Sequence, residues 1–133
     1  MGGTAPNLMT SSKLAHRIGE LALEKKALDV IILDLRELDA FTDYFVICSG
    51  EVDLQVKAIV DHIYETLLAE KVKPLSREGY ENLQWVLIDY IDCVLHVFLP
   101  DRREFYRLEK LWIDAEIEEL TDESPDLSPT NSK

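Results

Sequence analysis

Positive charge is scarce in this chain. Its 133 residues include 14 lysines and arginines against 26 aspartates and glutamates, which gives a formal net charge of −12 at pH 7. Proteins bind a nucleic-acid backbone through Lys and Arg side chains that release counterions from the phosphates. The composition therefore argues against direct binding to DNA or RNA. It favours a basic protein as partner, because an acidic surface attracts such a partner and speeds its approach.

Cysteines and long apolar runs are scarce as well. Cys48 and Cys93 lie inside short apolar runs, far apart and without C-x-x-C spacing. We expect them to be small buried hydrophobic residues in a reducing compartment, rather than a disulfide or a zinc site. No apolar run reaches membrane-spanning length, and the first dozen residues lack the pattern of a signal peptide. These absences predict a cytoplasmic protein that does not enter a membrane.

The hydrophobic residues, 47% of the chain, suffice for one domain with a buried core. Continuous apolar runs at 29–35 and 44–48 are typical of strands that are covered on both faces. Apolar residues at helical spacing follow Ser12 and Asp53, and each of these can cap its helix. The pattern predicts a single α/β domain with a mixed β-sheet and flanking helices. Its strands should be parallel where a helix crosses over and antiparallel at a hairpin.

The segment 84–112 carries the most informative pattern. Two apolar runs separated by polar turn residues predict a β-hairpin, and Pro100 ends its second strand. A helix is expected over 102–112, capped by Asp101. Large aromatic rings and arginines gather in this segment, and that combination is typical of the residues that dominate protein interfaces.

Both ends of the chain are expected to be loose. Residues 1–11 are rich in Gly, Pro, Thr and Ser and predict a flexible N-terminal arm. Residues 116–133 are acidic and then rich in Ser and Pro, with almost nothing to bury, so we expect a disordered tail. The α/β domain is therefore predicted to span residues 12–115.

Two arrangements resemble catalytic or ligand sites but lack essential parts. Ser49-Gly50 is similar to the start of a nucleotidyltransferase site, which also needs an Asp-x-Asp pair to hold magnesium. The nearby Asp89 and Asp92 have the wrong spacing and flank a tight turn, where Asp commonly hydrogen-bonds to the backbone. His62 and His96 have no Cys or carboxylate at ligand spacing. Hydrogen bonding in the core or at the surface is therefore favoured over metal binding or base catalysis.

The aromatic and basic side chains of the segment leave alternatives open. Trp85, Tyr90 and Tyr106 either belong to the core or contact a partner, whereas Phe98 is expected in the core. Three arginines of the predicted helix either clamp an anion or pair with acidic residues of that helix, and pairing is favoured. These are Arg102, Arg103 and Arg107.

Several motifs in a fixed order tie the chain to a known family. They are Thr-Asp-Tyr-Phe-Val-Ile-Cys-Ser-Gly at 42–50, Gln-Val-Lys-Ala-Ile at 55–59, Trp-Val-Leu-Ile-Asp-Tyr at 85–90, His-Val-Phe at 96–98 and Arg-Glu-Phe-Tyr-Arg-Leu-Glu-Lys-Leu-Trp at 103–112. Across residues 14–115, the sequence resembles the ribosomal silencing factor family, RsfS, also called Iojap.

The resemblance implies a small regulatory protein with neither enzymatic activity nor a cofactor. Such a protein binds large-subunit ribosomal protein fourteen at the subunit interface, keeps the small subunit from joining and so represses translation. The implied fold is distantly like that of nucleotidyltransferases without their catalytic acids, and relatives tend to form homodimers. The implied protein-binding residues, at the matching positions, are Trp85, Asp89, Tyr90, Arg103 and Tyr106.

Two positions depart from the family's pattern. Ile91 stands in the hairpin turn where the family usually has Gly, and a β-branched residue resists positive φ, so the turn must differ or be strained. Glu51-Val52 follows Gly50 where the family commonly has Thr-Ser, and the carboxylate would repel phosphate. Two rival functions stay open: a homodimeric scaffold with a different protein partner, and a nucleotidyltransferase-like enzyme with an altered site. The missing Asp-x-Asp pair counts against the enzyme.

Overall fold

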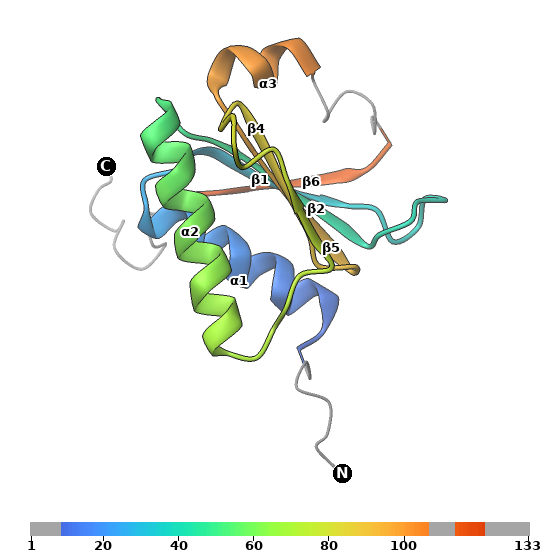
Figure 1. Cartoon of the computed structure of the whole chain (residues 1–133). Coiled ribbons are helices and arrows are strands. Elements are labelled where there is room, and N and C mark those ends of the chain that lie inside the picture. Colours follow the sequence, from blue (N-terminus) through green and yellow to red (C-terminus); the bar gives the residue numbers. More distant parts are fainter. Residues whose placement is uncertain (1–8, 107–113, 122–133) are drawn as a thin grey trace, which may run out of the picture.

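The alternating apolar runs form a mixed β-sheet with helices on it, in a computed structural model that describes residues 9–106 and 114–121 (Figure 1). For residues 104–106 it describes the backbone only. In chain order the elements are α1 (Ser11–Glu24), β1 (Leu28–Asp34), β2 (Tyr44–Ser49), α2 (Asp53–Ala69), β3 (Ser76–Glu78), β4 (Trp85–Asp89), β5 (Cys93–Phe98), α3 (Pro100–Tyr106) and β6 (Glu116–Leu120). The predicted α/β class is confirmed.

The strands of the described part of the chain lie in the order β3-β4-β5-β2-β1-β6. β2 and β5 run parallel, and the chain crosses between them through α2 and the β3–β4 segment. The other neighbouring strands pair antiparallel, including the predicted hairpin of β4 and β5. The prediction of a mixed sheet with an antiparallel hairpin is therefore confirmed.

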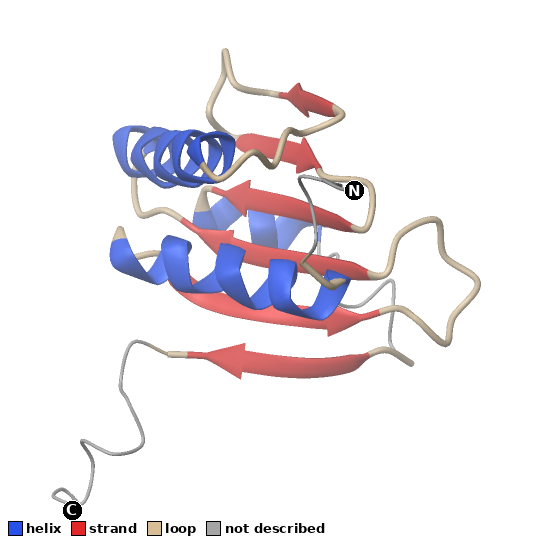
Figure 2. Cartoon of the chain, turned by 90° about the horizontal axis from the view of Figure 1, so that it is seen from below, coloured by secondary structure: helices blue, strands red, loops and turns tan. Residues whose placement is uncertain are grey.

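Two helices, α1 and α2, cover one face of the sheet (Figure 2). Their apolar stripes pack against alternate residues of the central strands, such as Val46 and Leu95, which are fully buried. Cys48 and Cys93 lie in this core as buried free thiols, as predicted. Burial raises the pKa of Cys48 to about 12, so its thiol stays protonated and unreactive at neutral pH. No helix of the described residues is long and apolar enough to cross a membrane.

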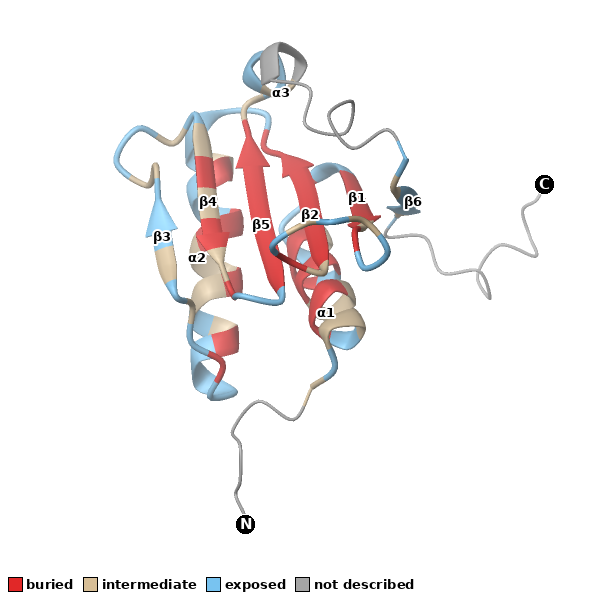
Figure 3. Cartoon of the chain, turned by 90° about the vertical axis from the view of Figure 1, so that its right-hand side faces the viewer, coloured by how far each residue is buried: buried red, intermediate tan, exposed pale blue. Residues whose placement is uncertain are grey.

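The opposite face, which we call the second face, carries a smaller cluster made from the other set of alternating residues. Its buried members are Ile31, Leu33, Leu35, Phe45, Ile47, Val94 and Phe98. Phe98 is fully buried there, as expected. Figure 3 shows that burial is concentrated in the central strands β2 and β5, whereas β3 and β6 at the edges are largely exposed.

Two predicted helix caps are one or two residues from the observed ones. α1 is capped by Thr10, whose hydroxyl accepts a hydrogen bond from the Lys13 N–H at 3.1 Å, and Ser12 lies inside the helix. Val52 occupies the cap position of α2 without a side-chain hydrogen bond, and Asp53 is the first helical residue. Its carboxylate still interacts favourably with the positive end of the helix dipole.

The helix after the hairpin also begins earlier than predicted. α3 starts at Pro100, a residue well suited to the first turn because its missing N–H has no partner there in any helix. Asp101 consequently lies in the first turn rather than at the cap. Residues 107–112 of the predicted helix lie outside the described residues.

The expectation of a disordered tail from residue 116 is wrong for its first five residues. Glu116–Leu120 forms β6, which pairs antiparallel with β1. The side chain of Leu120 packs so closely on α1 that a Cβ placed on Gly19 would clash with its Cδ1. The domain therefore extends beyond residue 115. The N-terminal arm over 1–8 and the tail over 122–133 lie outside the described residues.

Candidate protein-binding face

The alternation of side chains along β4 divides the residues predicted to bind a partner. Trp85, Leu87 and Asp89 point to the second face and are half-buried. Val86 and Ile88, between them, point to the helices and are fully buried. β4 therefore offers a row of partly accessible side chains on the second face, two of them apolar and one acidic. We call Trp85, Leu87 and Asp89 the β4 row.

Tyr90 does not belong to this row. It is only 4% exposed and lies in the core between the sheet and the helices. Burial raises the pKa of its hydroxyl above its ordinary value, and within the described residues the hydroxyl oxygen has no hydrogen-bond partner. The expectation that this ring is exposed for a partner is wrong. Trp85 and Tyr90 are five positions apart, and an odd separation places two residues on opposite faces of a strand.

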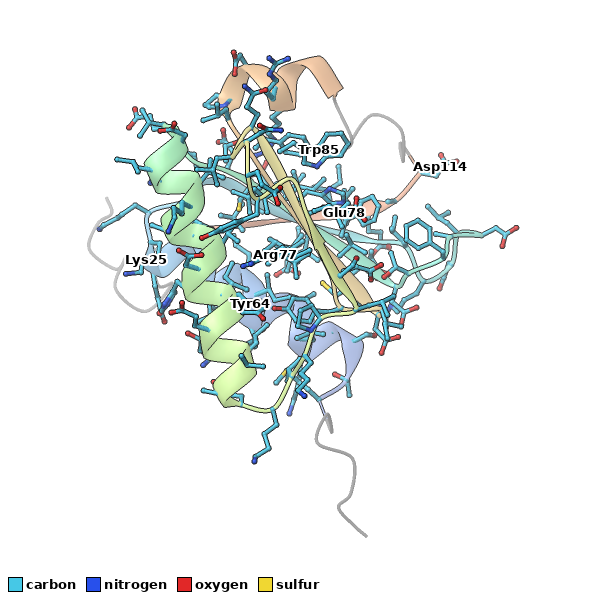
Figure 4. All side chains as sticks on the ribbon, in the orientation of Figure 1. Lys25, Tyr64, Arg77, Glu78, Trp85 and Asp114 are labelled. Carbon is cyan, nitrogen blue, oxygen red and sulfur yellow. The ribbon has the colours of Figure 1, made fainter. Side chains whose placement is uncertain are left out.

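Trp85 is held in place by contacts with its own sheet. Its indole ring stacks on Phe98, with ring centroids 5.0 Å apart. Its Nε1–H donates a hydrogen bond to Nδ1 of His96 at 3.1 Å. Figure 4 shows Trp85 on the side of the sheet away from α2, close to α3. A half-buried ring fixed in this way loses little conformational entropy when a partner covers the rest of it.

His96 lies beside the Trp85 ring and accepts its hydrogen bond. It is 3% exposed, and burial lowers its pKa to about 3, so the imidazole is neutral. Because Nδ1 accepts from Trp85, the proton is assigned to Nε2, which has no partner within the described residues. His62 lies on the other side of the sheet, where its Nε2–H donates a hydrogen bond to Oε1 of Glu24 at 2.8 Å and joins α2 to α1. Both histidines make the hydrogen bonds that the sequence favoured.

Asp89 lies at the far end of the β4 row and organises the hairpin turn. Its Oδ1 accepts a hydrogen bond from the Ile91 N–H at 2.7 Å, which is the turn-forming role expected of it. A second bond, from the Asp92 N–H to the Tyr90 carbonyl at 2.9 Å, closes a three-residue turn around Ile91. Ile91 has φ +76°, so the turn is strained, as its β-branched side chain led us to expect. Such a conformation costs about 1–3 kcal/mol.

The two remaining predicted residues lie on α3. Arg103 donates to the Asp29 carbonyl at 2.7 Å and to the Ser49 hydroxyl at 3.4 Å, so it fastens α3 to the ends of β1 and β2. These two bonds differ from the ion pair with its own helix that was favoured, whose candidate partner Glu104 has its side chain outside the described residues. Tyr106 is the last residue of α3 that the structure describes, and its side chain lies outside the described residues. Trp85 and α3 share one end of the sheet, whereas Asp89 lies at the other.

Among residues 9–106 and 114–121, the geometry does not assemble a nucleotidyltransferase site. Ser49 pairs in register with Phe98, and Asp89 pairs with Val94 four residues earlier on β5. The two groups, on strands either side of β5, are therefore about 13 Å apart along the strand direction alone. A hollow of about 540 Å³ lies beside Gly50, between the starts of α2 and α3. Its carboxylates belong to Glu51, Asp53 and Asp101. They would repel the phosphates of a nucleotide.

Some residues of this region escaped the sequence analysis. Leu87 belongs to the β4 row and was recoverable from the alternation that starts at Trp85. Phe41 and Leu75 are exposed apolar residues on two further loops at the same end of the sheet as the turn that carries Ile91. No local pattern brings three loops together, because that juxtaposition depends on the strand order of the sheet.

Comparison with known proteins gives consistent matches. The family model described as "Ribosomal silencing factor during starvation" (RsfS) matches residues 8–133. A ribosomal silencing factor RsfS from Halalkalibacterium halodurans is 41% identical over 112 residues, which is 84% of this chain and 96% of that protein. The mouse protein named "Mitochondrial assembly of ribosomal large subunit protein 1" is 33% identical over 95 residues, which is 69% of this chain and 42% of that protein. A crystal structure of a Chromobacterium violaceum protein is similar with a TM-score of 0.75 and 32% identity, covering 78% of this chain and 87% of that one.

Proposed function

Since this chain belongs to the ribosomal silencing factor family, a family of regulatory proteins rather than of known enzymes, we propose that it represses translation from the large ribosomal subunit. It binds ribosomal protein fourteen of that subunit at the subunit interface and keeps the small subunit from joining. The family match over nearly the whole chain carries this proposal. The name of the mouse relative, which refers to the large ribosomal subunit, supports the same target.

The β4 row is the part of the surface best suited to the contact. The ring of Trp85 is held rigidly by its own sheet, and part of it stays accessible to a partner. Truncating such a residue at an interface commonly costs about 2 kcal/mol or more of binding energy. Asp89 adds a carboxylate that suits a basic ribosomal protein. We keep Arg103 and Tyr106 of α3 in the proposed site, and Tyr90 supports β4 from the opposite face without contacting the partner.

The proposed mechanism is steric. A domain of this size on the interface side of the large subunit occupies space that the small subunit needs. Repression should therefore follow the fraction of large subunits that carry the protein, without turnover or a cofactor. The net charge of −12 raises the rate of encounter with a basic protein. A homodimer remains a further proposal from the family resemblance, which sedimentation velocity of the pure protein would test.

A site-directed cross-link tests the partner. A photo-reactive amino acid replaces Leu87 in the β4 row, and in a control protein it replaces Leu54, an exposed residue on α2. Each protein is mixed with purified large subunits, irradiated, and the attached component is identified by mass spectrometry. We expect ribosomal protein fourteen with the probe at position 87 and no specific product at position 54. Attachment at position 87 to ribosomal RNA or to another ribosomal protein would overturn the partner assignment.

A further inference from the structure

Three loops at the end of the sheet beyond the β4 row each carry an exposed apolar side chain. Phe41, Leu75 and Ile91 are 76%, 68% and 59% exposed, respectively. They come from the β1–β2 connection, the segment before β3, and the β4–β5 turn. We call Phe41, Leu75 and Ile91 the apolar loop edge. Exposed apolar side chains on neighbouring loops of a soluble domain can form part of an interaction surface.

Hydrogen bonds fix the three loops to one another. The Leu75 N–H donates to the Asp89 carbonyl at 2.7 Å, and the Ile91 N–H donates to the Asp89 carboxylate at the same distance. The buried hydroxyl of Thr42 donates to the Ile91 carbonyl at 2.8 Å, which ties the loop that carries Phe41 to the turn. The apolar loop edge is therefore positioned before any partner arrives, and binding to it need not order these loops.

The strained backbone of Ile91 indicates a functional role for its side chain. At φ +76° a glycine would adopt the turn without strain, whereas a β-branched residue is held there against its preference. The side chain points into solvent and contributes little to the core. The hairpin therefore carries an exposed isoleucine at its tip at a cost in backbone strain, which a role in binding would account for.

The surrounding charges select the kind of partner. Two aspartates flank Phe41 in the sequence, Asp39 and Asp43, and two flank Ile91, Asp89 and Asp92. The loop of Leu75 has no such carboxylate. Arg36, the cation on the loop of Phe41, is already paired with Asp34 at 2.8 Å, while Lys73 flanks Leu75. A second copy of this acidic chain would bring like charges together. A protein surface with an apolar centre and a rim of Lys and Arg fits instead.

The apolar loop edge also continues the proposed binding face. Asp89 of the β4 row accepts hydrogen bonds from the N–H groups of Leu75 and Ile91. The ring of Phe41 contacts Phe45, whose ring lies 4.6 Å from that of His96, the hydrogen-bond partner of Trp85. Resting on the proposed function, we propose that the apolar loop edge, with Ile91 as its anchor, is the part of the binding face that docks on an apolar, Lys- and Arg-rimmed patch of the basic ribosomal protein.

The test uses the full chain, purified large subunits and three variants. Ile91→Ala shortens the anchor, Ile91→Gly removes both the anchor and the strain, and Leu54→Ala shortens a matched exposed residue on α2. Binding is measured by co-sedimentation over a range of subunit concentrations. We expect both Ile91 variants to bind about fivefold or more weakly. We also expect Ile91→Gly to melt a few degrees higher than the wild-type protein, and Leu54→Ala to bind like it.

The outcomes separate this inference from the function on which it rests. If Trp85→Ala weakens binding while both Ile91 variants bind like the wild-type protein, the apolar loop edge is not part of the face and the proposed function stands. If the wild-type protein does not bind large subunits, both are overturned. If Ile91→Ala disrupts self-association in sedimentation velocity but not subunit binding, the occupant is a second copy and the inference is wrong.

Discussion

The ring and the hydroxyl of Tyr90 should contribute very differently to the free energy of unfolding. Its ring fills the core, but its hydroxyl has no hydrogen-bond partner within the described residues. Removing the hydroxyl in Tyr90→Phe should therefore leave the free energy of unfolding unchanged or raise it, whereas the cavity in Tyr90→Ala should lower it by about 3 kcal/mol or more. Urea denaturation of the two variants measures both effects. A large loss in Tyr90→Phe would mean that the hydroxyl has a partner.

His96 makes stability depend on pH in a defined direction. Burial lowers its pKa from 6.5 to about 3 in the folded protein, whereas the unfolded chain takes up a proton below about 6.5. Between these values the unfolded state binds more protons, so the free energy of unfolding falls as the pH falls. Urea denaturation at pH 7 and pH 5 should show a larger loss for the wild-type protein than for His96→Leu. Equal losses would mean that His96 accepts a proton without unfolding.

The sequence identified several residues of the proposed site better than it predicted their arrangement. Trp85 and Asp89 lie on the second face, and the alternation of β4 was enough to place them together. The gathering of aromatic residues and the family resemblance suggested Tyr90 as well, although the same alternation sends it to the core. Ile91 was identified as a conformational problem, but its place beside Leu75 depends on pairing between β3 and β4, which no local pattern specifies.

Among the elements, β6 gives a sharp prediction. It pairs with β1 over five residues and packs Leu120 against Gly19 of α1. His16 of α1 also lies 2.9 Å from Glu118, although both groups are too exposed for this pair to contribute more than about 0.5 kcal/mol. A chain truncated after residue 115 should melt several degrees below the full chain, whereas truncation after residue 121 should change the melting temperature little. Equal melting of the two truncated proteins would mean that β6 contributes nothing.

The central elements were predictable and the edge strands were not. β1, β2 and β5 are continuous apolar runs because both of their faces are covered, and such runs can be recognised in the sequence. β3 has the sequence Ser-Arg-Glu, and β6 is Glu-Ile-Glu-Glu-Leu. Edge strands are commonly short and charged because such residues discourage pairing with other chains, so they lack the apolar pattern that identifies a strand.

The charge of the whole molecule predicts how binding responds to salt. A chain with a net charge of −12 can neutralise few phosphates, and an apolar contact with a protein is only partly electrostatic. The logarithm of the association constant for large subunits should fall with the logarithm of salt concentration with a slope of about −2 or shallower. Co-sedimentation at several potassium chloride concentrations measures the slope. A slope of about −5 or steeper would indicate direct binding to ribosomal RNA.

The central claim is that this chain blocks subunit joining through the face that includes Trp85. Small and large subunits are mixed with increasing amounts of the wild-type protein, Trp85→Ala or Leu54→Ala, after circular dichroism has shown that each protein is folded, and are separated on sucrose gradients. We predict that the wild-type protein and Leu54→Ala convert joined ribosomes to free subunits, and that Trp85→Ala needs at least tenfold more protein, a factor that corresponds to about 1.4 kcal/mol of binding energy. Unchanged joining at saturating wild-type protein, or equal potency of folded Trp85→Ala, would contradict the account.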